Sequence, residues 1–411
     1  MSWYSTTLGE HFSKNQGVIQ TGPFGSQLHQ SDYKEVGTPV IMPKDIVNNR
    51  IDVGTIAKVN NEDRDRLKKH IVKVNDIVYP RRGEITKRAF ITEQEEGYIC
   101  GTGCILIRNV SLNLDSQFLN YFLSDKKTTD WLESNAVGST MKNLSGAILK
   151  KLPLVIPPME TQQKIASILS KYDNLIENNL KRIGLLEEAA QHLYKEWFVN
   201  FRFPGSENTS INEKTGLPEG WKRKSITEFE AFKQYKVKAK DFKGRKKYLA
   251  TADVVGLKVN RDVEKFEFNN KPSRAQIIPT NNSVWFARMS ATKKLLFFSN
   301  NSNSDYLISS GFVGFKAKTK YHLPFLFCLV NNDKFEMIKD SYATGSTQVS
   351  LNNKSLQKIE LVEPTQGLIE EFGKIVYPFL EEIETLFIYN ETLKEARDLL
   401  LPRLMNRTIE V

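Results

Sequence analysis

The residues best suited to chemistry in this sequence are cationic, and they are concentrated in one segment. Residues 222–247 contain eleven Lys or Arg against three acids, a net charge of +8 in a chain whose total is +10. Such a segment in a chain with aromatic residues is typical of proteins that bind a polyanion, most often nucleic acid. The alternative is a solvated lysine-rich loop, because runs of charge commonly just face water.

Motifs for catalysis are missing from the sequence. It has no Gly-x-x-x-x-Gly-Lys-Ser/Thr phosphate loop, and Gly101-x-Gly103 lacks the third glycine of a dinucleotide fingerprint. The five histidines are scattered, and no Asn/Asp-Pro-Pro-Tyr/Phe motif for adenine methyl transfer occurs. Cys100 and Cys104 are expected in one strand on the same side, where burial is a more ordinary role than metal binding. We therefore expect a chain that is not itself an enzyme and has no metal or cofactor of its own.

Composition narrows the class of protein further. Three cysteines cannot form a closed disulfide framework, and they fit a reducing cytoplasm. No stretch approaches the roughly 20 apolar residues of a membrane helix, and the N-terminus lacks the pattern of a signal peptide. At 411 residues and 40% hydrophobic content, we expect two or three folded domains in the cytoplasm.

The sequence repeats itself at an offset of 207 residues. The tripeptide at 138–140 returns at 345–347, Leu144 returns as Leu351, and Pro157 returns as Pro364. If the alignment is shifted by one residue, Arg82, Thr86 and Lys87 align with Arg288, Thr292 and Lys293. A nearly constant register over this distance indicates duplication of a whole unit.

Each repeat has the same order of expected elements. A strand-rich part comes first, then a short helix (118–132 and 325–338), and then the Gly-Ser-Thr tripeptide and a proline before a long helix. The expected strands are short β-favouring runs between turn-forming residues, at 40–42, 77–79, 89–91, 104–107, 284–286, 295–298 and 312–315.

The first long helix is expected over about 160–198, roughly 58 Å at ~1.5 Å per residue. Its apolar residues step by three and four from Ile165 to Trp197, a heptad-like stripe that favours pairing with another helix. Asn179 lies in this stripe, where it either fixes the register or sits at a wet edge. The second long helix is expected over about 368–401, and Pro378 should kink or divide it.

These elements predict an α+β fold with two tandem mixed α/β domains separated by two long helices. The helices would pair as an antiparallel coiled coil, and a pseudo-two-fold axis would relate the two repeats. The alternative is that each helix packs on its own domain.

Two motifs of the first repeat stand out, residues 21–28 (TGPFGSQL) and residues 79–87 (YPRRGEITK). They resemble the early loop and the RGxxxK segment of one known family, the DNA-specificity subunits of Type I restriction–modification systems. The stretch 138–205 is the most specific part of the resemblance, which covers essentially the whole chain. The second repeat departs from the pattern, because it has no GPFGS counterpart and residues 287–293 replace the Arg-Arg-Gly stretch.

The resemblance implies two target recognition domains (1–153 and 206–362) that read the halves of a bipartite site in double-stranded DNA. Two conserved helical regions (154–205 and 363–411) would separate them and recruit two modification (methyltransferase) subunits. Restriction/motor subunits would complete the complex, and S-adenosylmethionine, ATP and Mg²⁺ would act in these partners. The different loops of the second repeat are what a different half-site demands. The competing interpretation of the paired helices is a scaffold that tethers two protein partners without reading DNA.

Candidate contacts with DNA divide into those to phosphates and those to bases, because only base edges carry sequence. Arginine is preferred for bases, since a guanidinium can bind guanine through two hydrogen bonds. The phosphate candidates are Lys87, Arg88, Lys236, Lys238, Lys243, Arg245, Lys246, Lys247, Lys293 and Lys294. The base candidates are Arg81, Arg82 and Arg288, with Gln27, Asn143 and Gln348 as weaker candidates for adenine. Ser139 and Ser346 are expected instead to cap the helices that follow them.

Overall fold

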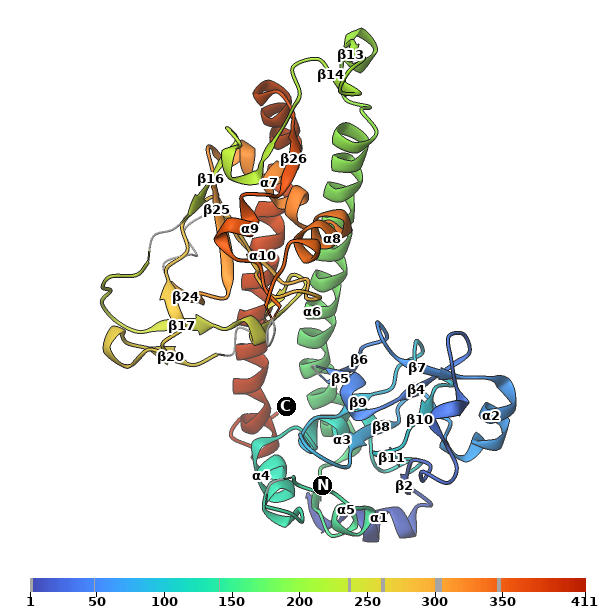
Figure 1. Cartoon of the computed structure of the whole chain (residues 1–411). Helices are drawn as coiled ribbons and strands as arrows, with labels where there is room; N and C mark the ends of the chain where they lie inside the picture. Colours follow the sequence, from blue (N-terminus) through green and yellow to red (C-terminus); the bar gives the residue numbers. More distant parts are fainter. Residues whose placement is uncertain are drawn as a thin grey trace. The chain divides into compact units, whose positions relative to one another are not determined.

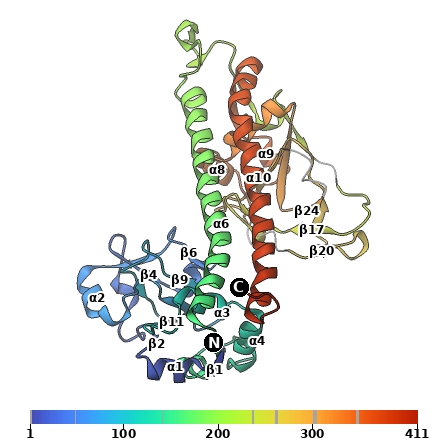
Figure 2. The same ribbon diagram turned by 180° about the vertical axis from the view of Figure 1, so that it is seen from behind.

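The computed structural model describes residues 3–47, 49–139, 141–235, 238–259, 263–299, 305–345 and 349–411. The chain forms two compact units, which we call unit 1 (Met1–Asn174 with Leu393–Val411) and unit 2 (Leu175–Thr392). Each unit has a strand-rich part and a stretch of both long helices, α6 (Met159–Tyr194) and α10 (Gln366–Met405) (Figures 1 and 2). The four domain ranges expected from the sequence remain a prediction. They differ from the two compact units, because each unit contains residues of both long helices.

Unit 1 is built from two four-stranded sheets, with strand orders β2-β11-β8-β9 and β10-β4-β7-β3, and from the ladder β1–β12. Its strands are β1 (Tyr4–Thr7), β2 (Val18–Thr21), β3 (Tyr33–Lys34), β4 (Thr38–Ile41), β5 (Ile46–Val47), β6 (Arg50–Ile51), β7 (Ala57–Val59), β8 (Ile77–Pro80), β9 (Ala89–Phe90), β10 (Ile99–Cys100), β11 (Cys104–Arg108) and β12 (Pro153–Ile156). Its short helices are α1 (Leu8–Lys14), α2 (Asn61–Arg66), α3 (Ser116–Phe122), α4 (Lys126–Asn135) and α5 (Gly146–Lys150).

Strand β11 lies between two cores of unit 1. Ile105 and Ile107 pack with Phe118 of α3 and with Ile165 of α6, whereas Leu106 belongs to a core that contains Ile41 of β4. Successive side chains of a strand point to opposite faces, so a strand buried on both faces is apolar throughout. Cys104 is buried here, and Cys100 lies on β10 of the other sheet, so the expectation of one shared strand was wrong.

Unit 2 has the corresponding sheets, β16-β25-β22-β23 and β20-β17-β24-β21, and the ladder β15–β26. Its strands are β13 (Ile211–Asn212), β14 (Leu217–Pro218), β15 (Lys222–Ser225), β16 (Phe232–Tyr235), β17 (Lys246–Leu249), β18 (Val254–Val255), β19 (Lys258–Val259), β20 (Lys265–Phe266), β21 (Ala275–Ile277), β22 (Ser283–Ala287), β23 (Leu295–Phe298), β24 (Tyr306–Ser309), β25 (Phe312–Ala317) and β26 (Glu360–Glu363). Its short helices are α7 (Leu323–Val330), α8 (Asp333–Ser341) and α9 (Asn353–Leu356).

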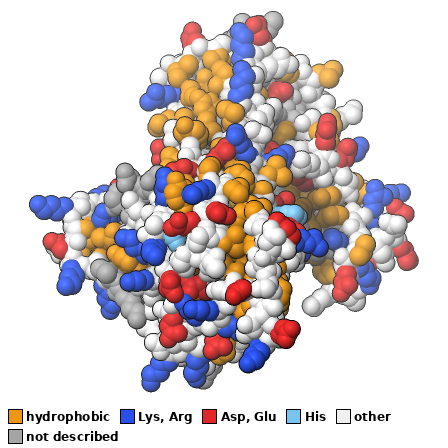
Figure 3. Space-filling model, turned by 90° about the horizontal axis from the view of Figure 1, so that it is seen from above, with side chains coloured by type: hydrophobic (Ala, Val, Ile, Leu, Met, Phe, Trp, Pro, Cys, Tyr) orange, Lys and Arg blue, Asp and Glu red, His pale blue; other side chains and the backbone are white. Residues whose placement is uncertain are grey.

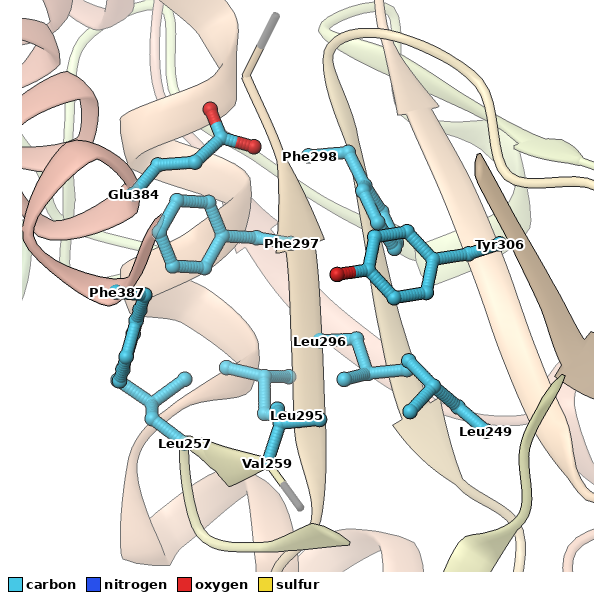
Figure 4. A pocket seen from close by; sticks show the side chains of 10 residues that line it. All are labelled: Leu249, Leu257, Val259, Leu295, Leu296, Phe297, Phe298, Tyr306, Glu384 and Phe387. Atoms are coloured by element: carbon cyan, nitrogen blue, oxygen red, sulfur yellow. The ribbon is translucent and has the colours of Figure 1, made fainter. Parts of the chain in front are cut away.

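Strand β23 shows how this sheet is fixed to the long helix α10. Figure 4 shows Phe297 on the side of α10, next to Glu384, and the neighbouring Phe298 on the opposite side, next to Tyr306 of β24. Glu384 is buried and accepts a hydrogen bond from the hydroxyl of Ser299. The period-two alternation of an apolar strand thus serves two cores at once.

The apolar stripe of α6 is buried as the heptad pattern predicts. In unit 2, Ile176, Ile183 and Ala190 of α6 are buried, as are Ile383 and Leu386 of α10. The amide of Asn179 donates to Oδ1 of Asn390 at 2.8 Å, which joins the two helices within unit 2. In unit 1, Arg397 of α10 contacts Asp173 of α6 through its Nη1 at 2.5 Å. Asn179 therefore has a partner across the seam rather than only water.

Two expected features of the helices differ in the structure. Of the two effects expected from Pro378, division of the helix is wrong, because α10 runs without a break from residue 366 to 405, and Pro378 lies on its exposed face. The two short helices each split in two, α3 and α4 in unit 1 and α7 and α8 in unit 2. In unit 2 Asn332 caps the start of α8, because its side chain accepts from the amide of Phe335 at 2.9 Å. Among the described residues, no helix combines the length and apolar character that a membrane span requires.

Candidate nucleic-acid interface

The turn after β8 holds the two adjacent arginines of the first repeat. The amide of Arg81 donates to the carbonyl of Gly103 at 2.7 Å, and the carbonyl of Arg81 accepts from the amide of Leu144 at 2.7 Å. Gly83 has a φ of +79°, a left-handed conformation that favours glycine. Two other segments of unit 1 therefore fix the backbone from which both side chains extend.

The two arginines differ in exposure. Arg82 is exposed, and no hydrogen bond or ion pair of its guanidinium is found within the described part of the chain. Arg81 is half-buried, and its Nε has no hydrogen-bond partner there. The neighbouring Asn143 also has a buried Oδ1 without a partner. Arg82 is thus the side chain of this turn that a ligand can reach directly.

The second repeat places Arg288 where the first places Arg81. The amide of Arg288 donates to Gly311 at 2.9 Å, and its carbonyl accepts from Leu351 at 2.8 Å, the same two bonds that hold Arg81. The isolated bridges Arg82–Asn143 and Met289–Ser350 complete the correspondence. The slip of one residue that paired Arg82 with Arg288 was therefore wrong, and Met289 is the counterpart of Arg82.

The guanidinium of Arg288 is partly occupied within unit 2. Its Nη1 donates to the carbonyl of Leu351 at 3.0 Å, and its Nη2 donates to Oδ1 of Asn353 at 3.2 Å. Burial lowers the pKa of Arg288. A guanidinium with these bonds would have to change partners to bind a base, so Arg288 is a weaker base candidate than Arg82.

Arg88 is not a phosphate contact in this structure. Only 4% of the residue is exposed, and its Nε donates to the carbonyl and to Oδ1 of Asn120 at 3.0 and 2.8 Å. Burial lowers the pKa of the Arg88 guanidinium. The sequence offered Arg88 only as a cation next to Lys87, whereas the fold makes it an internal support of α3.

Three other lysines of these turns already have partners at the surface. Lys87 pairs with Glu84 of its own loop, and Lys293 pairs with Asp333 at 3.2 Å. The ammonium of Lys294 donates to the carbonyl of Thr251 at 2.5 Å. Exposed ion pairs of this kind are weak, so phosphate groups can compete for Lys87 and Lys293.

The described part of the basic segment between β16 and β17 exposes several cations of unit 2. Lys238, Lys243 and Arg245 are exposed, and Arg245 donates through Nη2 to the carbonyl of Lys265 at 2.9 Å. Lys246 and Lys247 are half-buried at the start of β17, where Lys247 lies 3.8 Å from the carboxylate of Glu391 on α10. The segment therefore presents charge along an open loop and anchors its far end to α10.

The glycine-rich loop of residues 22–28 adds two residues that the sequence reasoning missed. Phe24 is 60% exposed at its tip, while the candidate Gln27 is exposed and its Oε1 accepts from the amide of Phe24 at 3.2 Å. Arg66 of α2 donates to the carbonyl of Gln27 and pairs with Asp32 at 3.3 Å. Arg66 was not apparent from the sequence, because neighbouring acidic residues balance its charge. Phe24 appeared in the sequence analysis only as part of the motif at residues 21–28.

Three candidates lie outside the described residues, namely Lys236, Ser346 and Gln348. Ser139 does not cap the helix that follows it, because the hydroxyl of Ser145 accepts from the amide of Ile148 at the start of α5. Asn352 has the same role for α9 in unit 2.

On the face drawn in Figure 3, Lys and Arg side chains are interspersed with Asp and Glu. The described residues hold no group of three or more His, Cys, Asp or Glu that could bind a metal ion.

Comparison with known proteins finds chains that are similar to this one. Residues 13–188 match the family model described as the Type I restriction modification DNA specificity domain. The Type I restriction enzyme MjaIX specificity subunit of Methanocaldococcus jannaschii is 26% identical over 311 residues, 71% of this chain and 68% of that protein. The HindI specificity subunit of Haemophilus influenzae is 23% identical over 430 residues, 89% of this chain and 93% of that protein.

A solved structure shares the fold along the whole chain. The Type I restriction–modification S subunit from M. genitalium matches with a TM-score of 0.54 at 16% identity, covering 98% of this chain and 96% of that one. This chain therefore has the same fold as that S subunit. The family model and both relatives are Type I restriction–modification specificity proteins, to which this chain is similar, and the resemblance predicted from the sequence is confirmed.

Proposed function

We propose that this chain reads a bipartite sequence in double-stranded DNA, with one half-site read by each unit. The observation that carries the proposal is the shared turn of the two repeats. The same backbone bonds hold Arg81 and Arg288, but the next residue is an exposed arginine in one repeat and Met289 in the other. One scaffold with different side chains at its tip suits two different half-sites, because base edges are distinguished by the groups that meet them.

In this proposal the exposed cations neutralise phosphates and orient each unit on the duplex. Lys238, Lys243 and Arg245 are the strongest phosphate candidates, because they are exposed on one open loop. Lys246 and Lys247 would assist them in unit 2. Arg82 and Gln27 would read bases in unit 1, where the glycine-rich loop allows a close approach to a groove.

The chemistry would lie in partner subunits. Two modification subunits would methylate adenine with S-adenosylmethionine, and restriction/motor subunits would use ATP and Mg²⁺, while this chain would be non-catalytic and hold no cofactor. The complex would act in the cytoplasm. Purified chain that methylated or cleaved DNA without these subunits would contradict this part of the proposal.

Adenine methylation mapping across a genome tests the DNA-reading function. We expect methylated bipartite sites when the chain is expressed with its modification subunit, and no such sites without the chain. Arg82→Ala should relax one position of one half-site by about 1–3 kcal/mol of discrimination, while the matched Met289→Ala should leave that half-site unchanged. A chain that fails to bind any DNA even with the modification subunit present would favour a scaffold without DNA specificity.

The long helices are proposed to set the number of unread base pairs between the half-sites. An insertion of a few residues within 170–195 should change the spacer and leave both half-site sequences intact. The same methylation map reports the outcome, and altered half-sites with an unchanged spacer would refute the idea.

A further inference from the structure

A groove in unit 1 lies outside the residues that we assign to DNA. It is formed by Trp3 before β1, by Phe122, Asp125 and Trp131 around α4, by Val155 of β12 and by Met405 at the end of α10. Most of these side chains are aromatic or aliphatic, but the carboxylate of Asp125 and the cations of Lys127 and Arg407 also line the groove. An apolar groove with a few polar groups is the usual form of a binding site.

Asp125 is the polar group that this groove does not satisfy. The residue is 5% exposed, and its buried Oδ1 has no hydrogen-bond partner in the described part of the chain. Although Asp125 precedes α4, its side chain makes no capping hydrogen bond to that helix. A buried carboxylate without a partner lowers stability, because it has lost its hydration and forms no hydrogen bond in its place.

The second repeat shows what this position looks like when it is satisfied. The residue in register with Asp125 is Asn332, at the same place before the second short helix. Its Oδ1 accepts from Phe335, and its amide donates to the carbonyls of Cys328 and Leu329 at 3.1 and 2.7 Å. The first repeat has therefore replaced an internally bonded amide by an acid that needs a donor from elsewhere.

The same comparison shows what fills the groove in unit 2. Trp221 corresponds to Trp3, since each precedes the first strand of an equivalent two-stranded ladder, β15–β26 or β1–β12. Trp221 is 6% exposed because the segment that follows α6 covers it, with Phe198, Phe201 and Phe203 at ring distances of 6.0, 5.3 and 5.6 Å.

In unit 1 no such aromatic segment covers the tryptophan within the described residues. Trp3 is only half-buried, and the group above its ring is the guanidinium of Arg407 at 4.4 Å. The space that the chain's own polypeptide fills in unit 2 is thus left as an open groove in unit 1.

We propose that the groove of unit 1 binds a segment of a separate protein partner that inserts an aromatic side chain beside Trp3 and Trp131 and a neighbouring Lys or Arg against Asp125. The aromatic part follows from the way that unit 2 covers Trp221, and the cation follows from the unpartnered carboxylate. An ionised acceptor forms its strongest hydrogen bonds with Lys and Arg donors. The proposal goes beyond the reading of DNA and does not depend on it.

The test uses the full chain and a synthetic fluorescein-labelled peptide with the sequence of residues 195–205 (KEWFVNFRFPG), which contains the covering segment of unit 2. Fluorescence anisotropy would measure its binding to wild-type chain and to Asp125→Asn, which copies the side chain of unit 2. Asp130→Asn is the matched control, because Asp130 lies on α4, five residues after Asp125, but is exposed and paired with Lys126. Thermal unfolding would verify that both variants are folded.

We expect saturable binding that weakens about tenfold in Asp125→Asn and stays unchanged in Asp130→Asn. A peptide with Gln in place of both of its basic residues should lose a similar factor, and a peptide with Ala in place of its aromatic residues should not bind. Absence of saturable binding at ~1 mM peptide would overturn the proposal, as would equal affinity of wild type and Asp125→Asn. Self-association of the free chain that Asp125→Asn abolishes would assign the groove to a second copy and would also overturn it. DNA binding by Asp125→Asn should equal that of wild type, so failure here is distinct from failure of the proposed function.

Discussion

The hydrogen bond between Asn179 and Asn390 allows a sharp test of how the two long helices recognise each other. Within unit 2 the bond lies between buried apolar layers that include Ile176, Ile183 and Ile383. Asn390 is 5% exposed, and its Nδ2 has no partner among the described residues. Its Oδ1 depends on Asn179, so removal of Asn179 leaves a buried amide with no hydrogen bond.

The expected magnitudes follow from the cost of a buried polar group without a partner. Asn179→Leu alone should lower the free energy of unfolding by about 1–3 kcal/mol, because Asn390 loses its bond. Adding Asn390→Leu removes both amides, including the Nδ2 that is unsatisfied in wild type, and adds apolar burial. The double variant should therefore exceed wild type by about 1–2 kcal/mol. Asn178→Leu is the control on the exposed face of α6 and should change stability by less than about 0.5 kcal/mol.

Urea unfolding followed by circular dichroism measures these differences as shifts of the midpoint at constant slope. The four chains form a double-mutant cycle, in which the two residues should couple strongly. If Asn179→Leu alone stabilised the chain as much as the double variant, the bond across the seam would have no energetic role. The reason to keep such a pair at a cost in stability is register, since one polar residue in an apolar seam selects one alignment of the helices.

Further predictions concern charge, burial and pH. The triple variant Lys238→Gln, Lys243→Gln and Arg245→Gln should weaken DNA binding and reduce the slope of log K against log salt by about 2 to 3, as measured by titrations at several salt concentrations; an unchanged slope would remove this loop from the phosphate contacts. Arg88→Met should instead lower the free energy of unfolding by about 1.5–3 kcal/mol and leave the salt slope unchanged, because its guanidinium serves Asn120. His322 is fully buried between Thr319 and Gln366, and this burial lowers its pKa in the folded state. Because the unfolded chain then binds a proton at a higher pH than the folded chain does, unit 2 should lose stability as pH falls below about 6.5. Denaturation at pH 5.5 and 7.5 should show this loss in wild type and a smaller loss in His322→Gln, and equal losses would exclude His322 as the cause.

Local patterns were enough to predict seven of the strands and both long helices. Runs such as 77–79, 104–107 and 295–298 became β8, β11 and β23, because β-branched and aromatic residues between turns favour strands in any context. The stripe of α6 was predictable because helical periodicity is written in neighbouring residues. The helix is not divided at Pro378, because the surroundings of a helix can outweigh the loss of one hydrogen bond.

Individual site residues were less predictable, because the same residue type is exposed or buried according to distant contacts. Arg82 and Arg88 look alike in sequence. Arg88 is buried because it bonds to Asn120, 32 residues away in the chain, whereas Arg82 faces solvent. Arg66 needed the fold to bring it beside Gln27, which is 39 residues away in the chain.

The sequence by itself determined that this protein is a duplicated unit with two long apolar seams and a concentrated positive charge, since repeats, periodicity and composition are properties of the chain alone. The tertiary structure decided that Arg81 rather than Arg82 corresponds to Arg288, and that Asp125 is buried without a partner where Asn332 is satisfied. These facts depend on hydrogen bonds between segments far apart in sequence, and such bonds exist only once the chain has folded.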